Sequence, residues 1–343
     1  MAALDHWHPV LPSRRLGRRP RAVDLDGRRI VLFRDGAGGL GALDRTCVHR
    51  RADLSRGSVV GGRLQCGYHG WTYDALGNAE SPSTPKMRAC ARSYRAAEKY
   101  GYIWLTSPES QAAIPEFDVQ GYEFVCARSY EAAAPLEVVL DNFTEVEHTP
   151  TTHANFGYDL ARMSEVSTRV ESTPDSVRVV NQGPQKKTPW IIQQLAGLKT
   201  GDLFTDDWVT YFSPVYTVYE QFWNDPETGR ERRDRYRIWV FFNPLDDDRT
   251  QLVVFAYLRS RSAARTAFIR LTRPLLSYIV HVEVMCDVKM LASLADKSPR
   301  LEGMKLSRFD RVLGLNRERI DRIYRGLPGP PRPELSPAAA ETA

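Results

Sequence analysis

The sequence predicts an α+β protein, in which an all-β N-terminal region precedes a region that combines an antiparallel sheet with helices. Short alternating apolar segments separated by glycine turns fill the first third of the chain, and longer ones recur up to residue 260. Apolar residues follow helical spacing over 136–146 and again over 280–291. The 343 residues, of which 42% are hydrophobic, are enough for a sizeable core and for two domains.

The N-terminal region contains four segments rich in β-branched and aromatic residues. They cover 29–35, 40–47, 63–74 and 100–106. The dipeptides Asp35-Gly36, Gly38-Gly39 and Gly77-Asn78 mark turns between them. We therefore predict an antiparallel β domain over residues 1–115.

The second region carries many aromatic residues in alternating segments. The segments 209–223, 237–245 and 251–260 are predicted as successive antiparallel strands of one sheet, curved around a large apolar pocket. The segment 224–235 is predicted as a charged hairpin tip. We expect this second domain to cover residues 116–327, and we predict that the Pro- and Ala-rich tail 328–343 is disordered.

Charge and composition restrict the classes of partner. The net charge of +5 comes largely from arginines, which either attract acidic electron-transfer partners or form an ordinary solvated surface. No nucleic-acid-binding motif accompanies them, so we expect no nucleic acid partner. No apolar run is long enough for a membrane span, and Cys90, Cys126 and Cys286 show no disulfide spacing, so we expect a cytoplasmic protein.

Two short segments each carry one cysteine and one histidine. Sixteen residues separate the pair Cys47 and His49 from the pair Cys66 and His69, in the pattern C-x-H-x16-C-x2-H. Two thiolates and two imidazoles can hold a structural zinc, or a [2Fe–2S] cluster with both thiolates on one iron and both imidazoles on the other. The mixed Cys and His content of each loop favours the cluster.

A second group of ligand-type residues follows the helical segment that starts near residue 136. Asn142, Glu145, His148 and His153 form the pattern N-x2-E-x2-H-x4-H, and Pro150 is predicted to end the helix between the two histidines. A helix that ends there can bring both imidazoles to one metal. With one carboxylate they would form a facial triad that holds Fe(II) and leaves positions open for O2.

The carboxylate is expected on a later helix, over 281–294. Glu283 and Asp287 stand four residues apart on it, next to apolar residues. A carboxylate in such surroundings costs free energy unless it is paired or bound to a metal. Both residues are therefore candidates for the third ligand.

The run CVHRRADLSRGSVVGGRLQCGYHGWTYDALGN, from Cys47 to Asn78, resembles the Rieske domain of the Rieske non-haem iron oxygenases. The segment 135–153 resembles the mononuclear iron motif of the same family. Val48 and Gly67 stand where many relatives have proline, and Glu145 stands where many have aspartate. The resemblance implies an N-terminal Rieske [2Fe–2S] domain and a helix-grip (START-like) catalytic domain.

The resemblance also implies a role for each motif residue. Cys47, His49, Cys66 and His69 would bind the [2Fe–2S] cluster, and His148, His153 and Asp287 would bind a mononuclear Fe(II), with Glu283 as the second choice for the carboxylate. Glu145 would form the electron bridge between His148 and His69 of a neighbouring chain. That bridge implies a homotrimer.

The function that the resemblance implies is oxygenation of an organic substrate. The enzyme would use O2, and electrons from a separate NAD(P)H-dependent reductase or ferredoxin, to hydroxylate or oxidatively demethylate a bulky, largely apolar aromatic or polycyclic molecule. An arene cis-dihydroxylating dioxygenase large subunit is the alternative within the family. An electron-transfer Rieske protein without oxygenase activity, or a zinc-stabilised binding protein, is the alternative from another class.

Overall fold

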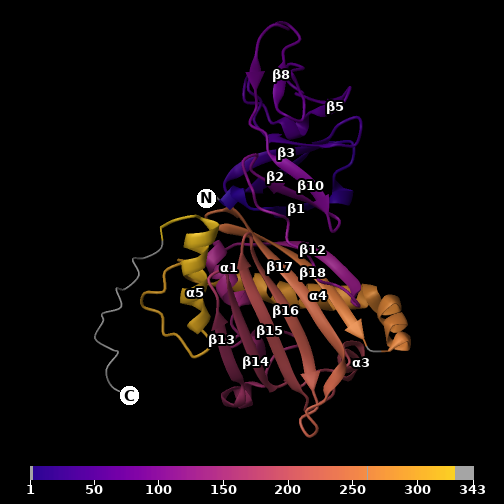
Figure 1. The fold of residues 1–343 in the computed structure, drawn as a ribbon, viewed down its shortest axis with the longest axis vertical. Helices are drawn as coiled ribbons and strands as arrows, with labels where there is room; N and C mark the ends of the chain where they lie inside the picture. Colours follow the sequence, from indigo (N-terminus) through magenta and orange to yellow (C-terminus); the bar gives the residue numbers. More distant parts are fainter. Residues whose placement is uncertain (1–2, 261, 329–343) are drawn as a thin grey trace.

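The computed structural model describes residues 3–260 and 262–328. The tail predicted to be disordered, 328–343, therefore lies outside the described residues except for its first residue. The described chain consists of a narrow N-terminal region that stands on one end of a large sheet, with helices behind that sheet (Figure 1). None of the described helices has both the length and the apolar composition needed to cross a membrane.

Three small antiparallel sheets make up the N-terminal region. The first has the order β1-β11-β10, from β1 (His8–Pro12), β10 (Arg95–Lys99) and β11 (Tyr102–Thr106). The second is β2-β3-β4, from β2 (Arg21–Leu25), β3 (Arg28–Arg34) and β4 (Leu40–Asp44). The third runs in order through β5 (Ser58–Val60), β6 (Arg63–Gln65), β7 (Thr72–Tyr73), β8 (Asn78–Glu80) and β9 (Ala89–Cys90). The prediction of an all-β N-terminal region is confirmed.

Strand β3 is buried on both faces and joins two hydrophobic clusters. Ile30 and Leu32 pack into one cluster, while Val31 and Phe33 pack into the other. Gly41 on β4 leaves room for the Phe33 ring, because a Cβ at that position would lie 2.2 Å from it. The strand that leads to Cys47 is therefore held against a packed core.

The second part of the chain forms one seven-stranded antiparallel sheet with the order β12-β18-β17-β16-β15-β14-β13. Its strands are β12 (Glu123–Ala132), β13 (Ser167–Ser172), β14 (Ser176–Pro184), β15 (Leu203–Phe212), β16 (Val215–Asn224), β17 (Glu231–Asp246) and β18 (Arg249–Ser260). The range 209–223 is thus not one strand but parts of two, joined by a tight turn at Ser213 and Pro214. The charged tip 224–235 is shorter than predicted, because β17 already begins at Glu231.

Within the described residues, five α-helices accompany this sheet. They are α1 (Leu136–Phe143), α2 (Thr149–Thr152), α3 (Trp190–Ala196), α4 (Ala263–Ser293) and α5 (Arg311–Arg319), and a π-helical turn, η5 (Ile320–Tyr324), follows the last. Short 3-10 helices are η1 (Ala3–Asp5), η2 (Ser13–Arg15), η3 (Leu54–Arg56) and η4 (Leu160–Glu165). Helix α4 is much longer than the predicted 281–294 and crosses behind the sheet (Figure 1). A sheet gripped by helices on one face confirms the predicted fold class.

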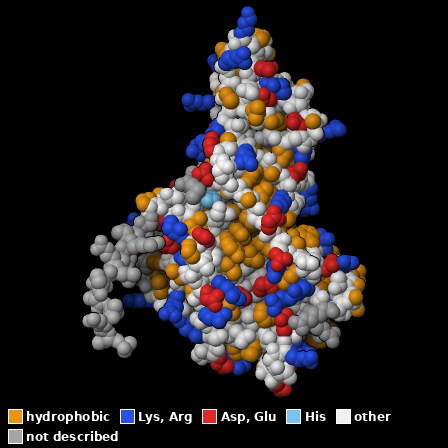
Figure 2. Space-filling view, in the orientation of Figure 1, with side chains coloured by type: hydrophobic (Ala, Val, Ile, Leu, Met, Phe, Trp, Pro, Cys, Tyr) orange, Lys and Arg blue, Asp and Glu red, His pale blue; other side chains and the backbone are white. Residues whose placement is uncertain are grey.

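The two faces of the sheet have different partners. On the outer face, Phe117 stacks on Trp239 with ring centroids 4.7 Å apart and joins a cluster that includes Trp7 and Trp104 of the N-terminal region. Figure 2 shows hydrophobic side chains gathered on this face just below the N-terminal region, with charged side chains spread over the lower part. The inner face is left for α1 and α4.

Candidate metal centres

The two loops with cysteine and histidine have the same backbone turn. The Arg51 N–H donates to the Cys47 carbonyl (2.9 Å), and the Gly70 N–H donates to the Cys66 carbonyl (3.1 Å). Each turn ends in the left-handed region, with φ 57° at Arg51 and 69° at Gly70. Each loop therefore presents a cysteine at its start and a histidine inside the turn.

The four side chains converge between these loops. Cys47 and Cys66 are buried, whereas His49 is exposed, and the centroids of the His49 and His69 rings lie 4.6 Å apart. Trp71 stacks on His49 at 5.1 Å, which agrees with a packing role for this tryptophan. The thiols thus lie on the protein side of the loops and the imidazoles on the solvent side.

The surroundings of the thiols fit a bound [2Fe–2S] cluster. Burial and the neighbouring Cys47 raise the pKa of the Cys66 thiol, whereas the backbone N–H groups of Tyr68 and His69 act in the opposite direction. The Tyr73 hydroxyl lies 3.0 Å from the Cys47 sulfur. Two buried cysteines side by side can both be held as thiolates only if a cation balances their charge, and the irons of a cluster would supply that charge.

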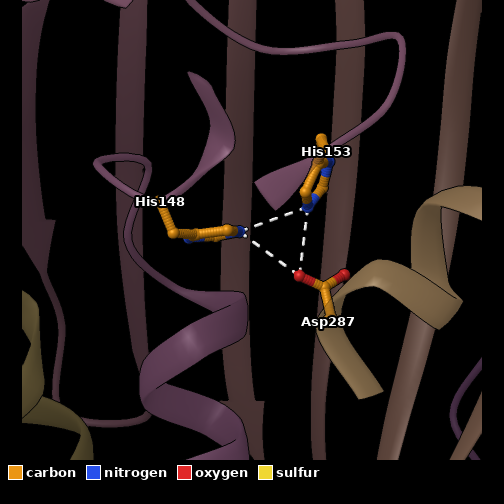
Figure 3. A group of neighbouring side chains, drawn as sticks. All are labelled: His148, His153 and Asp287. Atoms are coloured by element: carbon orange, nitrogen blue, oxygen red, sulfur yellow. Dashed lines mark hydrogen bonds and ion pairs between the residues drawn. The ribbon is translucent and has the colours of Figure 1, made fainter. Parts of the chain in front are cut away.

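The second candidate centre lies behind the sheet, where α1, α2 and α4 meet. His148, His153 and Asp287 point to one place (Figure 3). The two Nε2 atoms are 3.2 Å apart, and Asp287 Oδ1 lies 3.3 Å from His148 Nε2 and 3.0 Å from His153 Nε2. The structure therefore brings together the three residues that the family resemblance puts first for the mononuclear iron.

These separations match one face of an octahedral site. Three neighbouring ligands at about 2.1 Å from an octahedral metal lie roughly 3 Å from one another. Without a cation, two imidazole lone pairs and a carboxylate oxygen at this distance repel each other unless protons intervene. The donor set, two imidazoles and one carboxylate, is that of a facial triad that holds Fe(II).

The local sequence explains how the chain from the end of α1 to the end of α2 brings His148 and His153 together. Helix α1 ends at Phe143, because Thr144 leaves the helical region and its hydroxyl donates to the Leu140 carbonyl. The prediction that Pro150 ends this helix was wrong. Pro150 lies in the first turn of the next helix, α2, where its missing N–H costs no hydrogen bond. His148 and His153 flank α2 as its two cap residues.

Each ligand-type histidine has its own carboxylate on the far side of its ring. Glu145 Oε1 contacts His148 Nδ1, and Glu283 Oε2 lies 3.3 Å from His153 Nδ1. Such contacts fix the proton on Nδ1 and leave the Nε2 lone pair for a metal. Glu283, the second choice for the third ligand, therefore lies beside His153 on the side away from Asp287.

The pKa values of His153 and Asp287 indicate a site that favours a bound cation. Burial opposes charge on His153, but Asp287 and Glu283 outweigh it and raise the pKa of His153 to about 10. Burial also opposes charge on Asp287, yet His153 and His148 hold its pKa well below the ordinary value. Asp287 is thus held in its negatively charged form, and a metal ion or a proton must balance that charge.

Two positioning residues at this centre carry no signal in the sequence. Asn155 donates to Glu283 Oε1 from its side chain (2.6 Å) and its backbone (3.0 Å), which fixes the carboxylate that faces His153. Lys186 Nζ donates to the carbonyls of Thr149 (3.3 Å), Pro150 (3.1 Å) and His153 (2.6 Å). Lys186 therefore ties down the end of α2 that carries the second histidine.

Replacing Lys186 with methionine is expected to weaken iron binding at this centre by about tenfold, because the His153 end of α2 loses three hydrogen bonds. Competition with a chelator, followed by iron content and the spectrum of the reduced cluster, measures the effect. Lys187→Met is the matched control, since Lys187 is the exposed neighbour. Equal iron affinity in the two variants would show that Lys186 does not position the loop.

A cavity begins at this centre and runs between the sheet and the helices. It holds about 1040 Å³ of empty space, open solvent at its mouth included, and His148 and Asp287 lie in its wall. Four of the aromatic residues noted in the sequence line it: Phe156, Trp208, Tyr219 and Trp223. The predicted apolar pocket is therefore present on the inner face of the sheet.

Comparison with known sequences identifies the N-terminal region. The family model for the Rieske [2Fe-2S] domain matches residues 6–95. Methylxanthine N1-demethylase NdmA of Pseudomonas putida is 31% identical over 204 residues, 52% of this chain and 58% of the relative. The vanillate O-demethylase oxygenase subunit of a Pseudomonas strain is 32% identical over 152 residues, 42% and 46% of the two chains. Protein TIC 55 of Arabidopsis thaliana is 28% identical over 163 residues, but only 30% of its length is covered.

Comparison with solved structures extends the likeness to almost the whole fold. Pseudomonas putida NdmA with caffeine superposes with a TM-score of 0.69 at 22% identity, over 92% of this chain and 89% of the other. Dicamba monooxygenase bound to 3,6-dichlorosalicylic acid superposes with a TM-score of 0.69 at 17% identity, over 92% and 96% of the two chains. Both parts of the fold are thus arranged as in these proteins, whereas the sequence matches to the curated relatives above span less than two thirds of each relative.

Proposed function

The chain belongs to the Rieske non-haem iron oxygenase family, and on this premise we propose that it hydroxylates or oxidatively demethylates a bulky, largely apolar aromatic substrate with O2. The observation that carries the proposal is the position of His148, His153 and Asp287 in the wall of a cavity lined by aromatic side chains. The sequence relatives named above as demethylases act on methylxanthine and vanillate, which supports an aromatic substrate here.

In this proposal Cys47, His49, Cys66 and His69 hold a [2Fe–2S] cluster, and His148, His153 and Asp287 hold a mononuclear iron. When bound, the cluster supplies one-electron transfer and the mononuclear iron supplies activation of O2.

The residues of the chain prepare that chemistry. Glu145 and Glu283 keep a proton on Nδ1 of each histidine, so that both Nε2 atoms face the metal position. The aromatic wall, with Trp208 and Trp223, excludes water and orients a flat substrate beside it.

The electrons are proposed to come from a separate reductase or ferredoxin and to pass between copies of the chain. Within one chain, the loops with His49 and His69 adjoin the sheet of β5 to β9, and Figure 1 shows β5 and β8 at the end of the N-terminal region that lies far from the large sheet. A neighbouring copy that places its His69 against Glu145 would shorten the electron path from the cluster to the mononuclear iron. In a closed ring of three copies, each chain would make this contact with the next. The proposal requires a neighbouring copy to reach Glu145, whose side chain is partly exposed (14%).

Iron and acid-labile sulfide contents test the proposal on anaerobically purified protein. We expect about three irons and two sulfides per chain, and about two irons and two sulfides in the double variant His148→Ala with His153→Ala. The spectrum of the reduced cluster should be unchanged in the variant. Two irons in the wild type after iron loading would leave an electron carrier instead of an oxygenase, and zinc without sulfide would contradict both assignments.

A further inference from the structure

One carboxyl group in the cavity has no part in the metal centre. Asp206 on β15 is 7% exposed and lies between Phe204 and Trp208, whose side chains share its face of the sheet. Its only side-chain hydrogen bond within the described chain comes from Gln221 Nε2 (3.2 Å), directly opposite on β16. No Lys or Arg side chain among the described residues pairs with it.

A carboxyl group in this position is costly. Burial raises the pKa of Asp206 to about 7, whereas Gln221 and the charges of His153 and His148 act in the opposite direction. An apolar residue would suit the fold better at this point of the inner face. The cavity that Asp206 lines therefore offers the reason for its presence.

A second polar group of the cavity wall, two residues from Asp206, has no hydrogen-bond partner among the described residues. Trp208 is buried and lines the same cavity, and its indole N–H has no hydrogen-bond acceptor within the described part of the chain. Asp206 and Gln221 can accept a hydrogen bond through their side-chain oxygens, and Trp208 can donate one. A ligand that hydrogen-bonds both to the Asp206 and Gln221 oxygens and to the Trp208 N–H carries a donor next to an acceptor.

The charge of the cavity limits the ligand further. Its carboxylates are Asp206, Glu145, Glu283 and Asp287, and the described lining includes no Lys or Arg side chain. Even with a divalent iron held by His148, His153 and Asp287, four carboxylates leave the lining net negative, so an aromatic carboxylate would be buried beside like charge, which is strongly unfavourable.

We propose that Asp206, Gln221 and Trp208 bind an N–H donor beside a carbonyl acceptor, so that the substrates are neutral aromatic lactams or amides and not aromatic carboxylates. This inference rests on the proposed function, because it assigns a substrate class to the same cavity. Its test is a binding measurement that needs neither turnover nor a reductase, so its failure is separable from a failure of the oxygenase assignment.

The test uses three bicyclic probes and the anaerobic holoenzyme, with binding followed by calorimetry. Carbostyril carries the lactam, N-methylcarbostyril lacks the N–H, and naphthoate carries a carboxylate. We expect carbostyril to bind at least about tenfold more tightly than N-methylcarbostyril, since one buried hydrogen bond to a carboxyl group is lost. Naphthoate is expected to bind most weakly.

In Asp206→Leu the preference for carbostyril over its N-methyl derivative is expected to disappear. The variant should fold, because an apolar side chain replaces a buried carboxyl group. Asp207→Asn is the matched control, since Asp207 on the next position faces outward and pairs with Arg178 (2.7 Å). Naphthoate binding as tightly as carbostyril, or a preference that persists in Asp206→Leu, would overturn the inference.

Discussion

Replacing Asp287 with alanine is expected to remove the mononuclear iron and to lower substrate oxidation by roughly 1000-fold or more. Asp287 supplies the negative charge of the site, and without it two imidazoles alone must hold a divalent ion. A metal that stabilises the reacting oxygen is worth several kcal/mol of barrier, which gives this order of magnitude. Iron content and oxidation of an accepted substrate measure both effects, while the spectrum of the reduced cluster should stay that of the wild type.

The matched variant is Glu283→Gln, one helical turn away on α4. Glu283 contacts His153 Nδ1 and not the metal position, so iron should still bind, with an affinity lower by about 10- to 100-fold. The two variants therefore separate a ligand from a residue that orients a ligand. If Glu283→Gln lost all iron while Asp287→Ala kept it, the assignment of the carboxylate ligand would be reversed.

The parts of the fold that the sequence predicted are those set by local patterns. Alternating apolar residues located β3, β4 and β11 and, in the large sheet, β15 to β18, because the side chains of a strand alternate between its faces. Strands β12 to β14 were not predicted, and the predicted segment 63–74 is two short strands, β6 and β7, with the second Cys and His loop between them. The helix over α1 followed from the spacing of Leu136, Val139 and Leu140, all of which are buried. The length of α4 was missed, since its first half is largely exposed and carries Pro274, which by pattern alone interrupts a helix.

The metal centres were predictable only as sets of residues. Ligand chemistry and spacing selected the two histidines and two acidic candidates, but not which acid faces the metal position. That distinction depends on how α4 packs against the loop after α1, which is a tertiary contact. Lys186 could not be found from the sequence, because it acts on backbone carbonyls more than thirty residues earlier in the chain. Asp206 could not be found either, because the sequence does not show that its side chain points inward while that of Asp207 points outward.

Replacing Glu145 with glutamine is expected to slow turnover by about 100-fold while both metal centres remain filled. Glutamine keeps the size of the side chain but removes the charge that faces His148 Nδ1 and would face His69 of a neighbouring copy. The measurement is the rate at which the pre-reduced cluster is reoxidised when the protein meets O2 and substrate. Glu147→Gln is the control, because Glu147 is exposed and its described polar contact is a backbone one, from its N–H to the Glu145 carboxylate.

The same prediction requires the electron path to run between copies of the chain. Cys66→Ser should lack the cluster and Asp287→Ala should lack the mononuclear iron, so each is inactive alone. Co-expressed in one cell, the two variants form mixed assemblies in which an intact cluster of one copy faces an intact iron site of the next. Recovered activity in the mixture, lost again when Glu145→Gln is added to the Cys66→Ser chain, would place Glu145 on that path. No recovery in mixed assemblies would mean that each chain passes electrons within itself, and the bridging role of Glu145 would be wrong.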